Sequence, residues 1–305
     1  MHDEPSSQTP GESTITDILQ EITFQFKTGG IASPRLDAEL LLAFVLKLHR
    51  LDLYLQADRP LTTIESGEMY ELSKLRLDGI PVAYLLEQKE FWSINLKVFP
   101  GILIPRPETE LLVEIALPAM IRMQENHQGR RLRVVDYGTG TGAILLAMAS
   151  ELENLDFLGV DLSSQALKTA SINVDAHRQM LEKSKHRVFL VQGKGLENIG
   201  TEQSVDVLIS NPPYIRSDTI PTLRPEVNQE PRLALDGGVD GLEVFRNIFN
   251  EANESLVNGG ELMVEHGYDQ RNDLMELLEA YPYFGPPECF DDLEGRPRVM
   301  KLVKQ

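Results

Sequence analysis

The stretch Arg133-Val134-Val135-Asp136-Tyr137-Gly138-Thr139-Gly140-Thr141-Gly142-Ala143 joins a short apolar run to a glycine-rich loop, and an apolar segment with helical periodicity follows. A strand that leads through such a loop into a helix places the unpaired N–H groups of the helix N-terminus behind the glycines, where the backbone can approach a ligand closely. The stretch therefore predicts the first strand of an α/β sheet, with a nucleoside or dinucleotide ligand at its end.

The chain beyond this stretch alternates between strand and helix patterns. Strands are predicted at 133–136, 157–161, 188–191, 205–210 and 261–265, with helices at 111–123, up to 149, 164–180, 241–256 and 271–280, and a closing pair of strands at 288–290 and 298–303. Such alternation is typical of a doubly wound, mostly parallel, Rossmann-like sheet.

The first part of the chain has a different pattern. Residues 1–12 are polar and predict a disordered tail, whereas residues 13–88 predict a small helical bundle. Its helices are expected from Ile15 to Gly29-Gly30, from Ser33-Pro34 with one face formed by Leu36, Leu40, Leu41, Phe44 and Leu48, and over 63–77. A β-hairpin linker is predicted at 89–105, with its turn at Pro100-Gly101, and the α/β domain at 106–305.

Composition limits the classes of function. The chain has 305 residues, 42% of them hydrophobic, and a formal net charge of −18, which argues against nucleic-acid binding by phosphate neutralisation but is compatible with a local basic patch. The single cysteine, Cys289, excludes a disulfide framework, and the six histidines show no metal-ligand spacing, so no metal is expected. Without a membrane-spanning window or a signal peptide, the protein is expected to be soluble and cytoplasmic.

The glycine loop has the spacing G-x-G-x-G, which differs from the hydride-transfer and P-loop patterns. Asp161 ends the second predicted strand 19 residues beyond Gly142, close to the ~20 expected of an acid that accepts hydrogen bonds from ribose hydroxyls. The alternative is that Asp161 caps the helix that begins near Ser163-Ser164.

Asn211-Pro212-Pro213-Tyr214 follows the apolar run at 205–209 and Ser210. Because prolines donate no backbone hydrogen bond, the strand ends here, and the peptide oxygens of Asn211 and Pro212 are predicted to face a ligand. Asn211 adds a carboxamide, and Tyr214 adds a ring that can stack on a planar group. The alternative is a plain turn with Tyr214 packed at its rim.

In their order, the glycine loop, Asp161 and the stretch 211–214 resemble a class I S-adenosylmethionine-dependent methyltransferase that methylates a planar nitrogen. Further stretches are similar to the protein-(glutamine-N5) methyltransferases of the PrmC/HemK type, which modify the Gly-Gly-Gln loop of peptide chain release factors. They are Gly79-Ile80-Pro81-Val82-Ala83-Tyr84, Phe91-Trp92, Ile104-Pro105-Arg106-Pro107-Glu108-Thr109-Glu110, Glu230-Pro231-Arg232-Leu233-Ala234-Leu235-Asp236-Gly237-Gly238 and Glu265-His266-Gly267. The resemblance covers roughly 13–305. For residues 105–110, plain helix initiation remains the alternative to a place beside the site.

The resemblance implies a cofactor, S-adenosyl-L-methionine, with S-adenosyl-L-homocysteine as its product. It implies that Gly138, Thr139, Gly140, Thr141, Gly142, Asp161 and Asn211 hold this cofactor, that Asn211, Pro212, Pro213 and Tyr214 bind the substrate glutamine, and that Asn211, Pro212 and Tyr214 are catalytic. The implied partner is a release factor, and we expect a monomer that contacts neither membrane nor nucleic acid directly.

The segment after the predicted strand at 188–191 departs from the family pattern. An acidic residue followed by an aromatic is usual there, near the adenine, but this chain has Gln192-Gly193-Lys194-Gly195-Leu196. Two alternatives therefore stay open. One is a methyltransferase acting on an exocyclic amine of a nucleic-acid base, which poses the same geometric problem. The other is a non-catalytic methyltransferase-like binding module.

Overall fold

The computed structural model describes residues 13–126, 129–197 and 203–305, so the predicted tail at 1–12 lies outside the described residues. The chain divides into two compact units between Glu87 and Gln88. Each unit has its own hydrophobic core.

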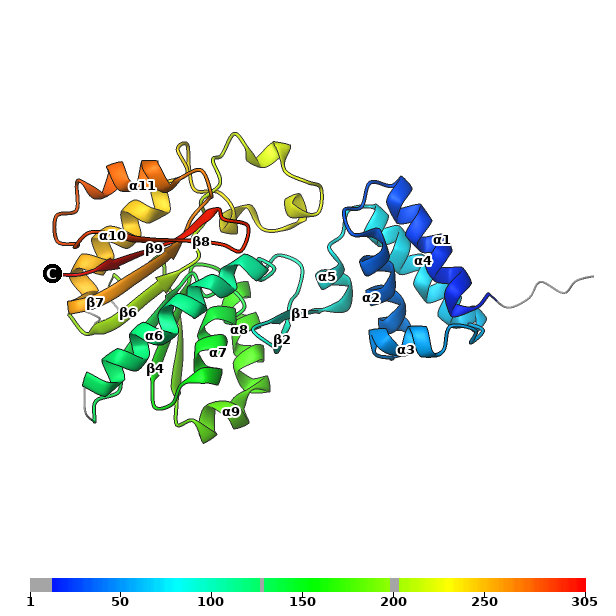
Figure 1. Cartoon of the computed structure of the whole chain (residues 1–305), viewed down its shortest axis with the longest axis horizontal. Coiled ribbons are helices and arrows are strands. Elements are labelled where there is room, and N and C mark those ends of the chain that lie inside the picture. The colour runs from blue at the N-terminus through cyan, green and yellow to red at the C-terminus, as the bar shows by residue number, and fades with distance from the viewer. Residues whose placement is uncertain (1–12, 127–128, 198–202) are drawn as a thin grey trace, which may run out of the picture. The chain divides into compact units, whose positions relative to one another are not determined.

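The first unit is helical (Figure 1). Its helices are α1 (Ile15–Thr28), α2 (Pro34–Leu46), α3 (Arg50–Leu55), α4 (Thr63–Leu77) and α5 (Val82–Leu86). Capping boxes begin α1 and α4, since Thr14 pairs with Asp17 and Thr62 pairs with Glu65 in the reciprocal arrangement that satisfies two orphan N–H groups. The predicted helical bundle is present, and α3 and α5 are short additions that periodicity alone did not indicate.

The predicted apolar face of α2 is wrong in part. Leu36 and Phe44 are 41% and 46% exposed, whereas Leu41 and Leu42 are fully buried. The buried face of α2 also carries Asp37, whose carboxylate lies 2.8 Å from the Arg76 guanidinium on α4. A prediction from apolar spacing misses a helix face that also buries charged side chains in ion pairs. The leucine spacing therefore assigned part of the buried face of α2 incorrectly.

The second unit is built on one seven-stranded sheet with the order β5-β4-β3-β6-β7-β9-β8 (Figure 1). Its strands are β3 (Arg133–Tyr137), β4 (Asp156–Asp161), β5 (Arg187–Gln192), β6 (Val205–Ser210), β7 (Leu256–Glu265), β8 (Glu288–Asp291) and β9 (Pro297–Val303). The first five pair in parallel, and β9 and β8 pair antiparallel at one end. The predicted doubly wound, mostly parallel sheet is confirmed.

Helices cover both faces of this sheet. The helices of the unit are α6 (Glu110–Asn126), α7 (Ala143–Glu151), α8 (Ser164–Ala176), α9 (Arg178–Lys183), α10 (Glu243–Ser255) and α11 (Arg271–Leu278). Helices α6 and α7 pack on the face that buries Val134 and Val207, while α10 and α11 pack on the face that buries Val135 and Leu208 (Figure 1). Neighbouring strand residues thus point to opposite layers, as the pleat requires.

The hairpin is present, but its predicted turn is wrong. Strands β1 (Gln88–Phe91) and β2 (Ile94–Lys97) are joined by Trp92 and Ser93, both with positive φ, and Pro100-Gly101 forms a separate turn after β2. A two-residue loop with both residues at positive φ matches the twist of the strands it joins. Because these positions hold neither glycine nor asparagine, the composition gave no turn signal.

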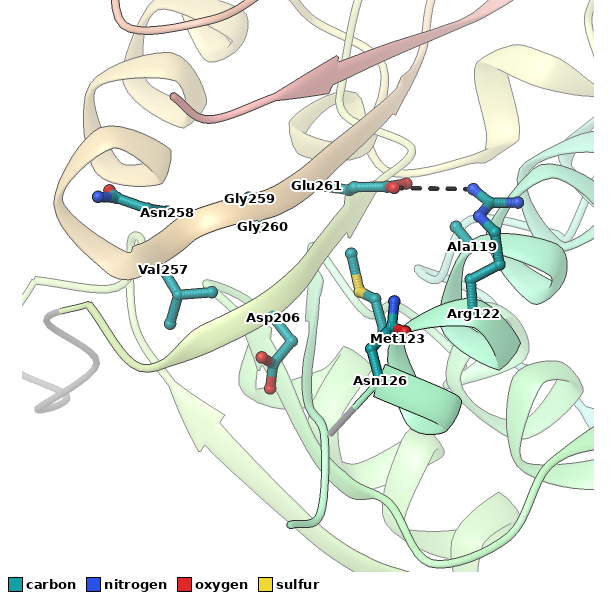
Figure 2. A pocket seen from close by; sticks show the side chains of 10 residues that line it. All are labelled: Ala119, Arg122, Met123, Asn126, Asp206, Val257, Asn258, Gly259, Gly260 and Glu261. Carbon is teal, nitrogen blue, oxygen red and sulfur yellow. Dashed lines mark ion pairs between the residues drawn. The ribbon is translucent and has the colours of Figure 1, made fainter. Parts of the chain in front are cut away.

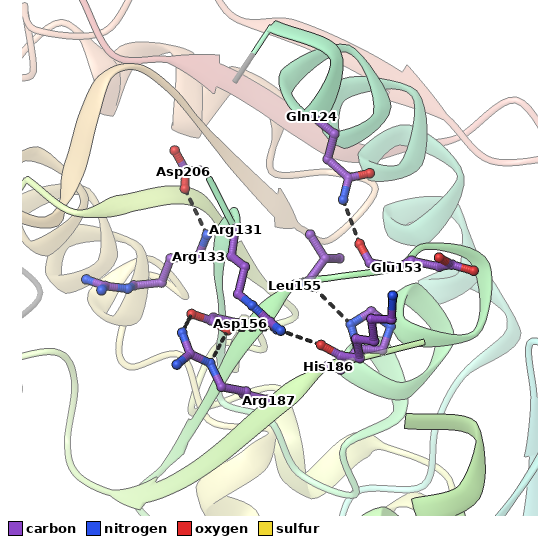
Figure 3. A network of polar contacts seen from close by, with 10 residues as sticks. Gln124, Arg131, Arg133, Glu153, Leu155, Asp156, His186, Arg187 and Asp206 are labelled. Carbon is purple, nitrogen blue, oxygen red and sulfur yellow. Dashed lines mark hydrogen bonds and ion pairs between the residues drawn. The ribbon is translucent and has the colours of Figure 1, made fainter. Parts of the chain in front are cut away.

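Charged side chains tie the amino ends of the strands together (Figure 3). Asp156 accepts a hydrogen bond from Arg187 Nε at 2.7 Å and lies 3.5 Å from Arg131 Nη1, and the N–H of Arg133 donates to Asp206 at 2.8 Å. The half-buried His186 ring accepts the Leu155 N–H through Nδ1, so its Nε2 faces backbone carbonyls as a donor. Arg131 and Arg187 therefore neutralise the Asp156 carboxylate. His186 has a structural role, because its ring binds backbone groups.

Breaking the buried pair in the first unit is expected to destabilise it. Asp37→Asn leaves the Arg76 guanidinium, which is buried, without its carboxylate, and the loss of one partner of such a pair costs about 3–5 kcal/mol. Calorimetric unfolding is expected to show a marked fall in the melting temperature. The control Asp175→Asn, which breaks the exposed pair with Arg178, is expected to change it little. Equal effects would contradict the assignment.

Candidate active site

The sequence motifs meet where the strand order reverses. From β3 the chain winds outward through β4 to β5, and it then returns to place β6 on the other side of β3, so that Tyr137 and Ser210 are neighbours at the carboxyl ends of adjacent parallel strands. The glycine loop follows Tyr137, and Asn211 follows Ser210. In open α/β sheets ligands bind at this switch point. The two motifs therefore form one candidate site.

The glycine loop has a backbone that requires glycine. Gly138, Gly140 and Gly142 all have positive φ, and a Cβ on Gly138 or Gly140 would meet open space or lie 3.9 Å from its nearest neighbour. The loop is anchored where the N–H groups of Gly138 and Thr139 donate to the Val160 carbonyl at 2.8 and 3.0 Å. Behind the loop, α7 begins at Ala143, where the positive end of the helix dipole lies.

Two carboxylates hold this loop. Asp136, fully buried at the end of β3, accepts the Thr139 hydroxyl at 2.7 Å. Asp161 accepts the Gly140 N–H at 2.9 Å and the Ser163 N–H at 2.8 Å. Asp161 thus braces both the loop and the entry to α8, while the N-cap itself is Ser163. Burial raises the pKa of Asp136 to about 7, and burial also raises the pKa of Asp161.

Asn211 is held by a residue from a distant segment. Its Nδ2 donates to the Thr109 hydroxyl at 2.9 Å, and Thr109 is only 4% exposed at the end of the short 3-10 helix η1 (Pro107–Thr109). Residues 105–110 therefore do lie beside the site. The Pro212 carbonyl oxygen accepts no hydrogen bond from any residue in the described ranges, so it is available as an acceptor.

Tyr214 is tied to β7 and to a closing loop. Its hydroxyl donates to Glu265 Oε1 at 3.2 Å, and burial, together with the charge of Glu265, raises the pKa of the Tyr214 hydroxyl. Its carbonyl accepts the Gln270 side chain at 2.9 Å. Gly237 packs so closely that a Cβ there would lie 2.8 Å from the Tyr214 Cα. The stretch 230–238 therefore fixes the backbone of the 211–214 motif by close approach.

Glu230 joins two further motifs. Its carboxylate accepts the Ile104 N–H at 3.0 Å and pairs with Arg106 at 2.5 Å, and the side chain is almost fully buried. The segment that carries Thr109 is thereby locked to the loop that carries Gly237. Both stretches carry the resemblance to the methyltransferase family, but no local pattern in the sequence predicts that they contact each other.

The segment Lys194-Gly195, which departs from the family pattern, contacts Glu251 and Tyr137. The Glu251 carboxylate, from α10, accepts the Leu196 N–H at 2.5 Å, and a Cβ on Gly195 would lie 2.1 Å from Glu251 Oε1. Lys194 is exposed, and its carbonyl accepts the Tyr137 hydroxyl at 3.0 Å. A side chain at position 195 would therefore have to displace the Glu251 carboxylate from its place beside the Leu196 N–H.

A cavity of about 270 Å³ lies elsewhere, at the amino-terminal half of β7 and the end of α6 (Figure 2). Glu261 and Arg122 face each other across it, 3.9 Å apart. It lies toward the amino-terminal ends of β6 and β7, away from the motifs. Parallel sheets bind their ligands at the carboxyl ends of the strands. We therefore assign the candidate site to the motif residues.

The fold and the site define a methyltransferase of the Rossmann-like class. A family model for the methyltransferase small domain matches residues 113–224, and one for the PrmC N-terminal domain matches residues 17–86. The solved structure of the hMettl16 catalytic domain in complex with MAT2A 3'UTR hairpin 6 matches with a TM-score of 0.53 at 16% identity, covering 79% of this chain and 81% of that one, which supports the fold.

The relatives narrow the class to one family. The release factor glutamine methyltransferase of Coxiella burnetii is 41% identical over 93% of this chain and 95% of its own length. That of Agrobacterium fabrum is 36% identical over 95% of this chain and 97% of its own length. The chain belongs to the release factor glutamine methyltransferase family, so the expected family is confirmed. Among the described residues, no helix is long and apolar enough to cross a membrane.

The raised pKa of Asp136 predicts how stability depends on pH. Burial raises the pKa of Asp136 from its ordinary 3.8 to about 7, so the stability linked to this proton is present at low pH and is lost as the pH rises through about 7. In Asp136→Asn, the fall in melting temperature from pH 5 to pH 8 is expected to be smaller than in the wild type.

The control for this test is Asp175→Asn, an exposed carboxylate on α8. It is expected to leave the pH dependence of the melting temperature unchanged. An Asp136→Asn profile parallel to that of the wild type would show that Asp136 titrates normally.

Proposed function

We propose that this protein transfers a methyl group from S-adenosyl-L-methionine to the side-chain amide nitrogen of the glutamine in the Gly-Gly-Gln motif of peptide chain release factors. The observation that carries the proposal is the Asn211 carboxamide, held by Thr109 beside the glycine loop at the switch point of the sheet. The names of the relatives favour this substrate over a nucleic-acid base and over a non-catalytic role.

The glycine loop fits the proposed cofactor. The residues that would hold it are Gly138, Thr139, Gly140, Thr141, Gly142 and Asp161, with Asn211 at the boundary to the substrate. The backbone is free of side chains at Gly138 and Gly140, and the Asp161 carboxylate oxygens keep acceptor capacity beyond their two N–H partners. When bound, S-adenosyl-L-methionine supplies an electrophilic methyl group on a sulfonium centre.

The chain's own residues must localise the amide nitrogen. A glutamine amide is a weak nucleophile because its nitrogen lone pair is delocalised into the carbonyl. We propose that Asn211 Oδ1 and the Pro212 carbonyl oxygen each accept one N–H of the substrate, which directs the lone pair to the methyl group and stabilises the positive charge that develops on nitrogen. No base is needed beforehand, since the proton can leave after transfer.

Pro213 and Tyr214 complete the proposed substrate site. Tyr214 is held by Glu265, Gln270 and the Gly237 backbone, so its position does not depend on the ligand. The residues that contact a substrate must be held rigidly if they are to keep its reacting atoms in position for transfer. We propose that the Tyr214 ring packs against the flat amide of the glutamine.

The helical unit is the proposed docking surface for the release factor. It matches the PrmC N-terminal domain, and its helix α3 exposes Leu51, Tyr54 and Leu55 by 69%, 54% and 74%. We propose that the protein acts as a cytoplasmic monomer without direct contact to nucleic acid, in keeping with its net charge of −18.

Mass spectrometry tests the substrate. A release factor incubated with the protein and S-adenosyl-L-methionine is expected to gain one methyl group, on the glutamine of its Gly-Gly-Gln motif. Labelled methyl found on nucleic acid instead would support the base-methylating alternative. Absence of calorimetric heat with S-adenosyl-L-methionine would support the non-catalytic one.

Replacing Asn211 tests the catalytic residue. Asn211→Ala removes one of the two proposed acceptors, and the loss of one such group typically lowers kcat by about 10²–10³-fold. The affinity for S-adenosyl-L-methionine, measured by calorimetry, is expected to fall far less. Asn250→Ala, an exposed asparagine on α10, is the control. Unchanged turnover in Asn211→Ala would remove Asn211 from the mechanism.

A further inference from the structure

An arginine-rich depression lies at the amino ends of three parallel strands (Figure 3). It has a volume of about 430 Å³, and the residues that line it are Gly129, Arg130, Arg131, Arg133, Asp156 and Arg187. Arg133, Asp156 and Arg187 are the first residues of β3, β4 and β5, and they are paired directly across these adjacent strands. The sheet therefore gathers positive charge at the end of its strands that lies away from the candidate active site.

The paired arginines of this depression share two carboxylates. Asp156 lies 2.7 Å from Arg187 Nε and 3.5 Å from Arg131 Nη1. Arg130 pairs with Asp206. The side chains of Arg187 and Arg130 are 58% and 47% exposed. A guanidinium has five N–H groups, and these pairs use only one or two of them, so both arginines keep donors for a further anion.

Arg133 is the arginine without a carboxylate partner. Its backbone N–H donates to Asp206, but its guanidinium makes no hydrogen bond or ion pair with any residue of the described ranges. The pKa of Asp156 is held below its ordinary value first by the hydrogen bond from Arg187 and also by the charge of Arg133. With two carboxylates for four arginines, two positive charges stay uncompensated, although the chain as a whole carries −18.

We propose that this depression binds a small phosphorylated ligand, whose phosphate groups are held by the arginine side chains at the amino ends of β3, β4 and β5. A phosphate monoester carries a charge of about −1.5 to −2 at neutral pH, which matches the two uncompensated positive charges. The planar guanidinium of arginine fits two oxygens of a phosphate group at once. The volume of the depression is within the range of small-ligand sites, which is about 300–1,000 Å³.

The distribution of charge favours a small ligand over a nucleic acid. A nucleic acid is bound by a basic face that follows several phosphates along its backbone. Here the arginines gather in one depression, whereas the chain as a whole is strongly acidic. An extended polyanion would therefore be repelled beyond the depression.

The glycine loop is the competing place for a phosphate group, because helix N-termini bind anions through their unpaired N–H groups. This loop follows the carboxyl end of β3 at Tyr137, whereas Arg133 begins the same strand. A strand rises about 3.3 Å per residue, so the two ends of β3 are roughly 13 Å apart. The two places can therefore be told apart in a binding experiment.

Calorimetric titration of the full-length protein with pyrophosphate, in metal-free buffer at constant ionic strength, tests the site. One equivalent is expected to bind. The melting temperature is expected to rise with the pyrophosphate concentration, because a ligand that binds only the folded state stabilises it. A wild-type protein that binds no pyrophosphate would overturn the proposal.

Arg133→Gln identifies the residues that bind the anion. Because the Arg133 guanidinium has no carboxylate partner, this change leaves no carboxylate unpaired. The loss of one charge-assisted contact is expected to raise the Kd for pyrophosphate about 10-fold or more. Arg178→Gln makes the same charge change at an exposed arginine of α9, outside the depression. This control is expected to change the Kd less than about 2-fold, because salt screens a distant charge. Equal losses in the two variants would show attraction by net charge alone and would overturn the proposal.

Competition experiments separate the depression from the glycine loop and from a nucleic-acid surface. Saturating pyrophosphate is expected to leave the affinity for S-adenosyl-L-methionine unchanged, and Arg133→Gln is expected to keep the wild-type affinity for it. Displacement of S-adenosyl-L-methionine by pyrophosphate would place the anion at the glycine loop and overturn the proposal. A single-stranded oligonucleotide that binds more tightly than pyrophosphate, and loses this affinity in Arg133→Gln, would instead assign the depression to nucleic acid.

Discussion

The parallel pairing of β3 with β6 is the constraint on which the site depends. It brings Tyr137, the last residue of β3, next to Ser210, the last residue of β6, although 73 positions separate them in the chain. The Ser210 hydroxyl donates to the Tyr137 carbonyl at 2.7 Å, so the two strand ends are also linked by a side chain. The glycine loop and the Asn211 motif are neighbours for this reason, and neither could form the candidate site alone.

Around this pairing, buried polar side chains fix the irregular segments. Glu230 locks the segment before α6 to the loop at 230–238, Asp161 braces the glycine loop, and Glu251 fills the space beside Gly195. Each of these carboxylates accepts backbone N–H groups that no helix or strand satisfies. A buried N–H without a partner is costly, so these contacts specify single loop conformations.

The sequence was sufficient for the sheet and for the two motifs, because apolar runs, glycine spacing and consecutive prolines are local signals. It was insufficient for Thr109, Glu265 and Asp136, whose roles depend on contacts between segments far apart in the chain. It also misled at α2, where Asp37 and Glu39 are buried in ion pairs, and at Trp92-Ser93, where residues of ordinary turn propensity adopt positive φ. The contact of Gly195 with Glu251 could not be predicted either, because Glu251 lies on a helix that begins 48 residues after Gly195.

Asn173 on α8 links the hairpin to the glycine loop. Its fully buried carboxamide exchanges hydrogen bonds with the backbone N–H and carbonyl of Lys97 in β2, and it also donates to the Thr141 carbonyl in the glycine loop. The hairpin and the loop are thus clamped to one amide, and neither can shift without breaking bonds to it. A substitution that displaces β2 is therefore expected to disturb the glycine loop as well, because both segments bind the same carboxamide.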